Sequence, residues 1–173
     1  MKKEFILILH IELLSGIVSQ IQKHTYIALL LDLVLIRLME RKSGTTDYII
    51  GSKEYLSKQV ESITILNKIP TEEIAEKWDV SYSGDESVIA WVEESSMLED
   101  GTQLYDLYIA SNGVIAPESC SYLFAYYINC ESIEGLENIS TSEVKDMSFM
   151  FDRCCNLQDI ELSDFDTSNV ADM

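Results

Sequence analysis

Two histidines, four cysteines and several adjacent acidic pairs are the side chains in this 173-residue chain whose types could do chemistry. His10 and His24 both lie in an apolar N-terminal segment, so the rest of the chain has no histidine for general base or metal work. Acidic pairs such as Glu72–Glu73 and Glu93–Glu94 are adjacent, which on a strand places the two carboxylates on opposite faces. We interpret them as solvated surface. The chain contains no serine nucleophile elbow, phosphate loop or dinucleotide fingerprint.

The cysteines are separated by 9, 23 and 0 residues, and they are Cys120, Cys130, Cys154 and Cys155. Paired zinc ligands lie two to four residues apart, so these spacings fit no zinc template. Cys130 and Cys154 occupy the same position of an internal repeat, which favours buried thiols stacked in register. A disulfide, such as one between Cys120 and Cys130, and a metal site are the alternatives.

One motif has the oxygen-ligand spacing that opens an EF-hand calcium loop, Asp79-x-Ser81-x-Ser83-Gly84. The bidentate acid of such a loop belongs at position 12, which is Ala90 here. The flanks also read as strands, so a Ser-Gly turn is the favoured interpretation and calcium the alternative. The sequence therefore predicts no catalytic, no cofactor-binding and no metal-ligating residues, and no cofactor.

Charge divides the chain into two different pieces. It carries 30 acidic and 12 basic residues, a net charge of -18, which argues against a nucleic-acid partner. Residues 1–42 hold six cations and four anions, a net of +2, so residues 43–173 hold a net of -20. The acidic exterior favours basic partners.

Residues 1–42 are predicted to be an apolar helical segment, either a degenerate export signal or a membrane anchor. Lys2 and Lys3 followed by an apolar run resemble the start of a signal peptide, but no small-residue cleavage site follows. The second apolar run, residues 26–39, is shorter than a spanning helix and contains Asp32 and Arg37. The alternatives are helices that pack on a partner or on each other, and a start codon assigned too early.

Residues 43–122 are predicted to form a small β-rich cap module. Residues 60–66 alternate as a half-buried strand does, and residues 87–92 and 104–109 are β-rich runs separated by an Asp100-Gly101 turn. Asn112-Gly113 supplies a further tight turn before residues 114–116. Residues 70–78 are predicted to be a short helix, since Pro70 opens it and acids follow.

Residues 123–173 contain an internal repeat of 24–26 residues. Thr141-Ser-Glu-Val-Lys-Asp-Met147 recurs as Thr167-Ser-Asn-Val-Ala-Asp-Met173. Val144, Met147, Phe151 and Cys154 have helical spacing, and Leu157, Ile160 and Leu162 suggest a short strand. Each unit is therefore predicted to be a helix and a strand that hide their apolar faces by stacking. The predicted fold is α+β: an apolar N-terminal helical segment, the β-rich cap, and a leucine-rich-repeat-like α/β solenoid of about two repeats.

These repeats resemble the BspA-like leucine-rich repeat of bacterial surface proteins. The resemblance covers residues 78–173 and is carried by Met150-Phe151 and by Cys154-Cys-Asn-Leu-Gln-Asp-Ile-Glu-Leu-Ser-Asp-Phe-Asp-Thr-Ser-Asn-Val-Ala-Asp-Met173. The unit before it, residues 132–139, is a looser copy. The resemblance does not extend to residues 1–42, where members of that family would be expected to carry a clean export signal. Since solenoids usually need three or more repeats and polar caps, we expect the chain to be a fragment of a longer reading frame.

The resemblance implies a non-enzymatic cell-surface or membrane-associated protein that mediates protein–protein or host-cell interaction, as an adhesin does. The partners expected are proteins, with membrane attachment through residues 1–42 and no small-molecule substrate. Two alternatives are a targeting module of a longer surface enzyme, and a membrane-anchored protein in which residues 1–42 are the functional part. The candidate contact residues are tyrosines, with core packing expected for at least half of them: Tyr105, Tyr108, Tyr122, Tyr126 and Tyr127.

Overall fold

The computed structural model divides the chain into two compact units, Met1–Leu35 and Ile36–Met173. The structure describes residues 38, 46–158 and 160–173, all of which belong to the second unit. The helical segment predicted for residues 1–42 therefore lies outside the described residues, apart from Leu38. This leucine is buried and forms an isolated antiparallel bridge with Ser81.

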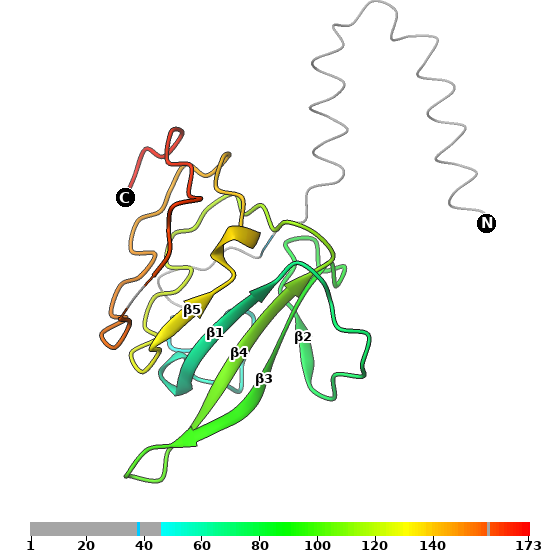
Figure 1. Cartoon of the computed structure of the whole chain (residues 1–173), viewed down its shortest axis with the longest axis vertical. Helices are drawn as coiled ribbons and strands as arrows, with labels where there is room; N and C mark the ends of the chain where they lie inside the picture. The colour runs from blue at the N-terminus through cyan, green and yellow to red at the C-terminus, as the bar shows by residue number, and fades with distance from the viewer. Residues whose placement is uncertain (1–37, 39–45, 159) are drawn as a thin grey trace, which may run out of the picture. The chain divides into compact units, whose positions relative to one another are not determined.

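A five-stranded mixed sheet is the centre of the described fold (Figure 1). Its strand order is β2-β3-β4-β1-β5, in which β1 pairs in parallel with both β4 and β5 and the remaining pairs are antiparallel. The strands are β1 (Val60–Leu66), β2 (Lys77–Asp79), β3 (Val88–Met97), β4 (Gln103–Ser111) and β5 (Ser132–Glu134). Two 3-10 helices, η2 (Ser57–Gln59) and η3 (Leu136–Asn138), complete the regular elements.

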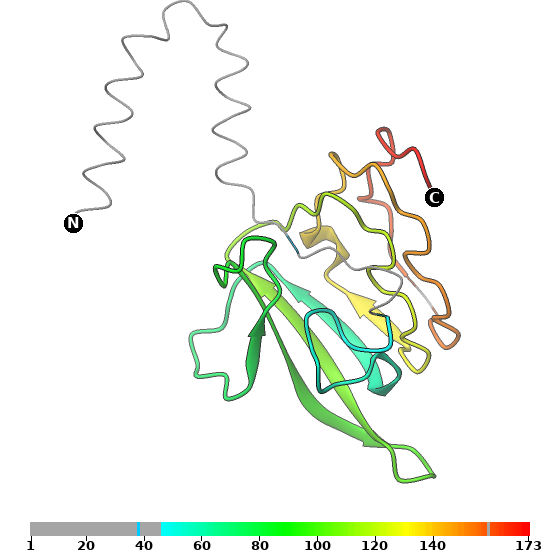
Figure 2. The same cartoon turned by 180° about the vertical axis from the view of Figure 1, so that it is seen from behind.

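Three of these strands confirm the sequence prediction. Strand β1 has the predicted bounds, and it buries Val60, Ile63 and Ile65. Strands β3 and β4 form the predicted hairpin, closed by hydrogen bonds between Leu98 and Thr102 and from Gly101 to Leu98. The hairpin projects beyond the rest of the sheet in both views (Figures 1 and 2).

The helix predicted for residues 70–78 is wrong. Lys77, Trp78 and Asp79 form strand β2, and no helix is present in residues 70–76. The Trp78 indole packs on the Tyr55 ring and donates a hydrogen bond to the Ile50 carbonyl at 2.9 Å. These long-range contacts outweigh a helix-start signal, because Pro70 followed by acids sets only a local preference.

One face of the sheet is covered by the segment of residues 46–56, drawn in cyan and seen from behind in Figure 2. Ile49 and Ile50 from this segment are buried in one core cluster with residues of β1 and β4. The same cluster continues into the C-terminal part of the chain, through Phe124, Leu136, Val144 and others. The cap and the C-terminal segments therefore share one core.

C-terminal to β4 the chain runs in stacked segments joined by backbone hydrogen bonds. We name residues 119–127 the first row and residues 146–154 the second row. Four first-row amides donate to second-row carbonyls 26 positions along the chain, at 2.7–3.1 Å: Cys120 to Asp146, Tyr122 to Ser148, Phe124 to Met150, and Tyr126 to Asp152. A third segment, residues 166–172, then bonds to the start of the second row, as Met147 donates to Asp172 at 2.8 Å.

The fold class α+β is wrong, because the described residues contain no α-helix and the regular structure is mostly a mixed sheet. The repeat helix predicted from the spacing of Val144, Met147, Phe151 and Cys154 is replaced by successive tight turns. In these turns the amides of Val144, Met150 and Asp152 donate to carbonyls three residues back. Apolar residues three or four apart face one side both on a helix and in a series of tight turns, so their spacing could not distinguish the two structures. The strand predicted at residues 157–162 is also absent from the residues described there.

Gly135 allows the stacked segments to approach the sheet. It follows β5 with φ of 79°, and a Cβ atom at this position would lie 2.0 Å from the Ile65 carbonyl oxygen of β1. Asn138 donates its side-chain amide to the same oxygen at 2.9 Å. A side chain at residue 135 would therefore separate the two strands.

We expect Gly135→Ala to lower the free energy of unfolding by more than the ~1–2 kcal/mol that a left-handed backbone alone costs. Gly101→Ala is the matched control, because Gly101 has φ of 85° and a Cβ added there would have no atom within 4 Å. Urea denaturation of the two variants separates the clash with β1 from the backbone preference. Equal losses in both variants would contradict the proposed contact.

Candidate interaction surface

Large side chains of the first and second rows stack in pairs across the row-to-row hydrogen bonds. The rings of Tyr122 and Phe149 lie 5.0 Å apart at 15°, and those of Phe124 and Phe151 lie 5.7 Å apart at 14°. The Arg153 guanidinium carbon lies 5.1 Å from the centre of the Tyr126 ring, within the range of a cation–π contact. We name the side chains of this surface that are not fully buried the aromatic row: Tyr122, Tyr126, Phe149, Phe151 and Arg153.

The backbone under the aromatic row is left-handed at matching positions. Tyr122 and Tyr126 have φ of 56° and 67°, and their partners Phe149 and Arg153 have φ of 57° and 60°. This conformation costs a residue with a side chain roughly 1–2 kcal/mol, and bulky residues adopt it rarely. The same turns therefore recur in both rows, with a large side chain where glycine or asparagine would cost less.

Short side chains at the start of each row hold these turns. In the second row, the Ser148 amide and hydroxyl donate to Asp146 Oδ1 at 2.8 and 2.6 Å. In the first row, the Ser121 amide donates to the Ser119 hydroxyl at 3.1 Å, and the hydroxyls of Ser121 and Ser148 lie 3.1 Å apart. The turn that precedes Tyr122 is thus repeated before Phe149.

In several turns an aspartate accepts hydrogen bonds from the serine two residues further on, and these bonds lower the pKa of the aspartate carboxyl. Hydrogen bonds from Ser148 lower the pKa of Asp146, and those from Ser168 lower the pKa of Asp166. Hydrogen bonds from Ser87 lower the pKa of Asp85 to about 2. These acids are therefore held as carboxylates because their turns need an acceptor.

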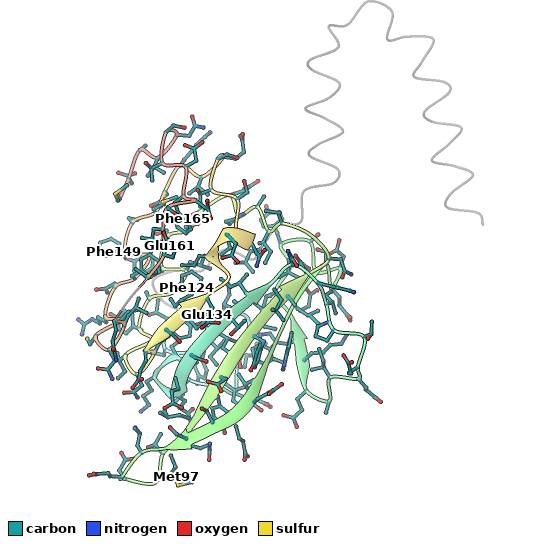
Figure 3. All side chains as sticks on the ribbon, viewed as in Figure 1. Met97, Phe124, Glu134, Phe149, Glu161 and Phe165 are labelled. Carbon is teal, nitrogen blue, oxygen red and sulfur yellow. The ribbon has the colours of Figure 1, made fainter. Side chains whose placement is uncertain are left out.

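A hollow of about 350 Å³ adjoins the aromatic row at Tyr126. Besides Tyr126 it is lined by Thr46, Asp47, Tyr48, Leu56, Lys58 and Ile128. Tyr48 and Ile128 are 42% and 36% exposed, and Phe149 on the row itself is 57% exposed. Figure 3 shows Phe149 on the stacked segments and Met97 on the distant β3–β4 hairpin. The row and the hollow therefore share Tyr126, and the hollow adds the exposed side chains of Tyr48 and Ile128 beside it.

The structure separates the five candidate tyrosines. Tyr122 and Tyr126 lie in the aromatic row, whereas Tyr127 is buried and its hydroxyl accepts a hydrogen bond from the Ile50 amide. The Tyr105 ring lies edge-on to Tyr55, and Tyr108 stacks on Trp91 at 5.1 Å.

Sequence reasoning placed no contact role on Phe149 or Arg153. A signal for both was present, because each lies 27 positions after a candidate tyrosine, Tyr122 and Tyr126 respectively.

The calcium-like motif forms a side-chain-capped turn. Asp79 Oδ1 accepts the Ser81 amide at 2.8 Å and Oδ2 accepts the Glu86 amide at 3.1 Å, so both oxygens are used within the loop. Ala90, at the position of the missing bidentate acid, lies in β3 opposite Trp78. Within residues 38, 46–158 and 160–173, no group of three or more His, Cys, Asp or Glu is placed to hold a metal ion. His10 and His24 lie outside the described residues.

All four cysteines are free thiols. Cys120 and Cys130 are fully buried, Cys154 is half-buried and Cys155 is exposed. Burial, followed by the nearby charge of Asp146, raises the pKa of Cys120 to about 12, and burial raises the pKa of Cys130 to about 12. The disulfide alternative between Cys120 and Cys130 is therefore absent from this structure.

Comparison with known proteins gives one match. Residues 118–173, which include both rows, match the family described as "Mycoplasma protein of unknown function, DUF285". No curated protein and no solved structure matches the chain. Among the residues that the structure describes, no helix is long and apolar enough to cross a membrane.

Thiol labelling should distinguish the cysteines. We expect a maleimide to modify Cys155 in the folded protein and to modify Cys120 and Cys130 only after unfolding, because a buried thiol with a raised pKa has almost no thiolate. Mass spectrometry of the labelled peptides, with and without urea, makes the measurement. Rapid modification of Cys120 in the folded chain would contradict its burial.

Acid should destabilise the fold through the capped turns. A folded-state pKa below the unfolded value, about 4 for aspartate, gives stability that is present above that pH and is lost as the pH falls. The loss should extend down to the lowered pKa of about 2 at Asp85. Asp146→Asn keeps the acceptor oxygen but removes one titration, so its urea midpoint should fall less between these pH values. An unchanged pH dependence in this variant would exclude Asp146 as a contributor.

Proposed function

We propose that the described part of the chain is a non-enzymatic protein-binding module and that the aromatic row is its contact surface. One observation carries the proposal: two successive rows hold large side chains outward at the same left-handed positions, Tyr122 with Phe149 and Tyr126 with Arg153. A fold that needed only the turns would be more stable with glycine or asparagine there. A binding role for these large side chains would therefore explain why the left-handed backbone beneath them is kept despite its free-energy cost.

The residue types support this role. Tyrosine, phenylalanine and arginine are enriched in protein interfaces, because they bring large contact area together with a polar or charged group. The row is rigid, since its rings are stacked in pairs and the backbone beneath is hydrogen-bonded at four places. Little side-chain entropy is then lost on binding.

The net charge indicates the kind of partner. Residues 43–173 hold a net charge of -20, which favours a partner with a basic contact surface. We also propose a cell-surface or membrane-associated location, supported by the BspA-like resemblance of residues 78–173 and the apolar residues 1–42.

A comparative capture experiment tests the function. The full chain is immobilised in three forms, wild type, Phe149→Asn and Met97→Asn, and is exposed to a cell-surface protein extract with quantitative mass spectrometry as the readout. Asparagine tolerates the left-handed backbone of Phe149, and Met97 is an exposed control, 63% accessible on the hairpin. We expect at least one protein to be retained by wild type and Met97→Asn and depleted fivefold or more, a loss of about 1 kcal/mol, by Phe149→Asn.

Three identical sets of retained proteins would contradict a contact role for the aromatic row. Urea midpoints of the two variants, measured beforehand, exclude unfolding as the cause of any loss.

A further inference from the structure

A second hollow, of about 530 Å³, lies beside β3 near the point where β2 ends. Strand β2 pairs with β3 only from Ile89 to Trp91, and β3 continues past it toward the hairpin turn (Figure 1). Residues 91–93 of β3 form one wall of the hollow, and residues from the segment 70–76, which precedes β2, form the other. We name it the β3 hollow. Its volume lies within the range of roughly 300–1,000 Å³ that is typical of ligand sites.

Both walls of the β3 hollow are anchored in the fold. Ile69 and Ile74 pack against a small core cluster that includes Trp91. Trp91 in turn stacks on Tyr108, with ring centres 5.1 Å apart at 10°. The Ile69 amide also donates to Asn112 Oδ1 at 3.1 Å. The segment before β2 is therefore held at both the backbone and the side chains, and the hollow is formed before any ligand arrives.

Part of the lining is apolar. Besides Trp91, the side chains of Pro70, Ile74 and Val92 line the β3 hollow. A long side chain with an aliphatic stem can pack on such a surface while its charged head stays in contact with water and polar groups.

The rest of the lining is acidic, and it consists of Glu72, Glu73, Glu76 and Glu93. Hydrogen bonds position two of these carboxylates. The Trp91 indole donates to Glu93 Oε1 at 3.4 Å, and the Tyr55 hydroxyl donates to Glu76 Oε2 at 2.8 Å. The hollow thus combines an apolar surface with several negative charges.

The described part of the chain supplies no cation to these carboxylates. None of the four forms an ion pair within residues 46–158 and 160–173, and the neighbouring Lys77 pairs with Glu86 at 3.2 Å instead. None of the six basic residues of 43–173 lines the hollow. Four like charges around one hollow repel each other, so a cation that enters it is favoured.

The lining also indicates which kind of cation fits. No three acidic side chains of the described residues are close enough to hold a metal ion together. An apolar surface beside separated carboxylates instead matches a lysine or arginine side chain, which has an aliphatic stem and a charged head with several donors.

We propose that the β3 hollow binds a lysine- and arginine-containing segment of a partner protein. The stem of a basic side chain packs on Ile74, Trp91 and Val92, and its head lies among the carboxylates of Glu73, Glu93 and their neighbours. The site is separate from the aromatic row, so the inference goes beyond the function proposed above.

Charge and topology favour a partner as the occupant. A second copy of this chain brings a net charge of -18, which is repelled by the acidic lining. The six cations of residues 1–42 are offset by four anions, so that segment matches the hollow less well than a basic segment does. The segments after β5 stack at the opposite end of the sheet order from β2 and β3, so continued stacking leads away from the hollow.

A basic peptide tests the proposal on the full chain. The probe is acetyl-Gly-Ser-Arg-Leu-Lys-Ser-Gly-amide, and the control peptide has citrulline in place of arginine and acetyl-lysine in place of lysine, which keeps the stems and removes the charges. In ¹⁵N–¹H spectra we expect the probe to shift the indole N–H signal of Trp91 in a saturable manner. The indole of Trp78, which donates to the Ile50 carbonyl at 2.9 Å in the main core, is the internal reference and should not move.

Two double variants separate the local charges from the net charge. Glu73→Gln with Glu93→Gln removes two carboxylates from the hollow and should weaken probe binding about fivefold or more. Glu134→Gln with Glu137→Gln removes two exposed carboxylates at and after β5, where Figure 3 labels Glu134, and should leave binding within about twofold. All four positions are exposed, so both variants should fold as the wild type does.

Several results would overturn the proposal. These are a Trp91 indole signal unmoved at about 1 mM probe, equal binding of the neutral peptide, and an equal loss in both double variants. Carbodiimide cross-linking of the full chain without probe gives a further check. Cross-links from Glu73 or Glu93 to lysines of residues 1–42 would show that the chain itself occupies the hollow.

The outcome is independent of the capture experiment. Phe149→Asn leaves the lining of the β3 hollow unchanged, and the glutamate variants leave the aromatic row unchanged. Loss of either site therefore does not decide the fate of the other.

Discussion

Parallel pairing on both edges of β1 is the interaction on which the described fold depends. On one side β4 extends the sheet toward the hairpin and β2, and on the other β5 begins the path to the stacked segments. Three further contacts reach β1 and its entry from the stacked side: Glu131 to Glu61, Asn129 to Lys58 and Asn138 to Ile65. Because the first row directly precedes β5, its position is set by these contacts, and each later segment is placed by the one before it.

The strands could be predicted where a short run has either alternating burial or β-rich composition. Strand β1 shows the alternation, and the β3–β4 hairpin combines two β-rich runs with the Asp100-Gly101 turn, so local pattern and tertiary structure agree. The helices could not be excluded from sequence, because Val144, Met147 and Met150 have the same spacing in consecutive tight turns as on a helix. The difference between a helix and these turns is that the second-row carbonyls accept hydrogen bonds from the first row instead of from a following helical turn. Sequence periodicity carries no information on the partners of backbone carbonyls.

The candidate surface was predictable only in part, for a related reason. Tyrosines were selected by residue type, which brought in Tyr127, although its hydroxyl is satisfied in the core by the Ile50 amide. Phe149 and Arg153 were overlooked because a phenylalanine in an apolar pattern is usually interpreted as core. Both have a left-handed backbone, and that of Phe149 directly follows the Asp146–Ser148 turn, so its exposure depends on the turn rather than on the hydrophobicity of the residue itself.

The lengths of the strands bear on how the protein avoids aggregation. The strands at the two ends of the sheet order, β2 and β5, have three residues each, whereas the apolar strands β1, β3 and β4 have seven to ten and lie between them. A sheet grows into a fibril by adding strands to a long, flat and apolar edge. Here β2 covers Ile89–Trp91 of β3, and β5 covers Ser62–Thr64 of β1. The exposed remainder of β3 carries Glu93 and Glu94, whose charges oppose the addition of another strand. At the covered apolar segments, edge-to-edge polymerisation would require prior opening of the sheet, so resistance to it there should depend on the stability of the whole core.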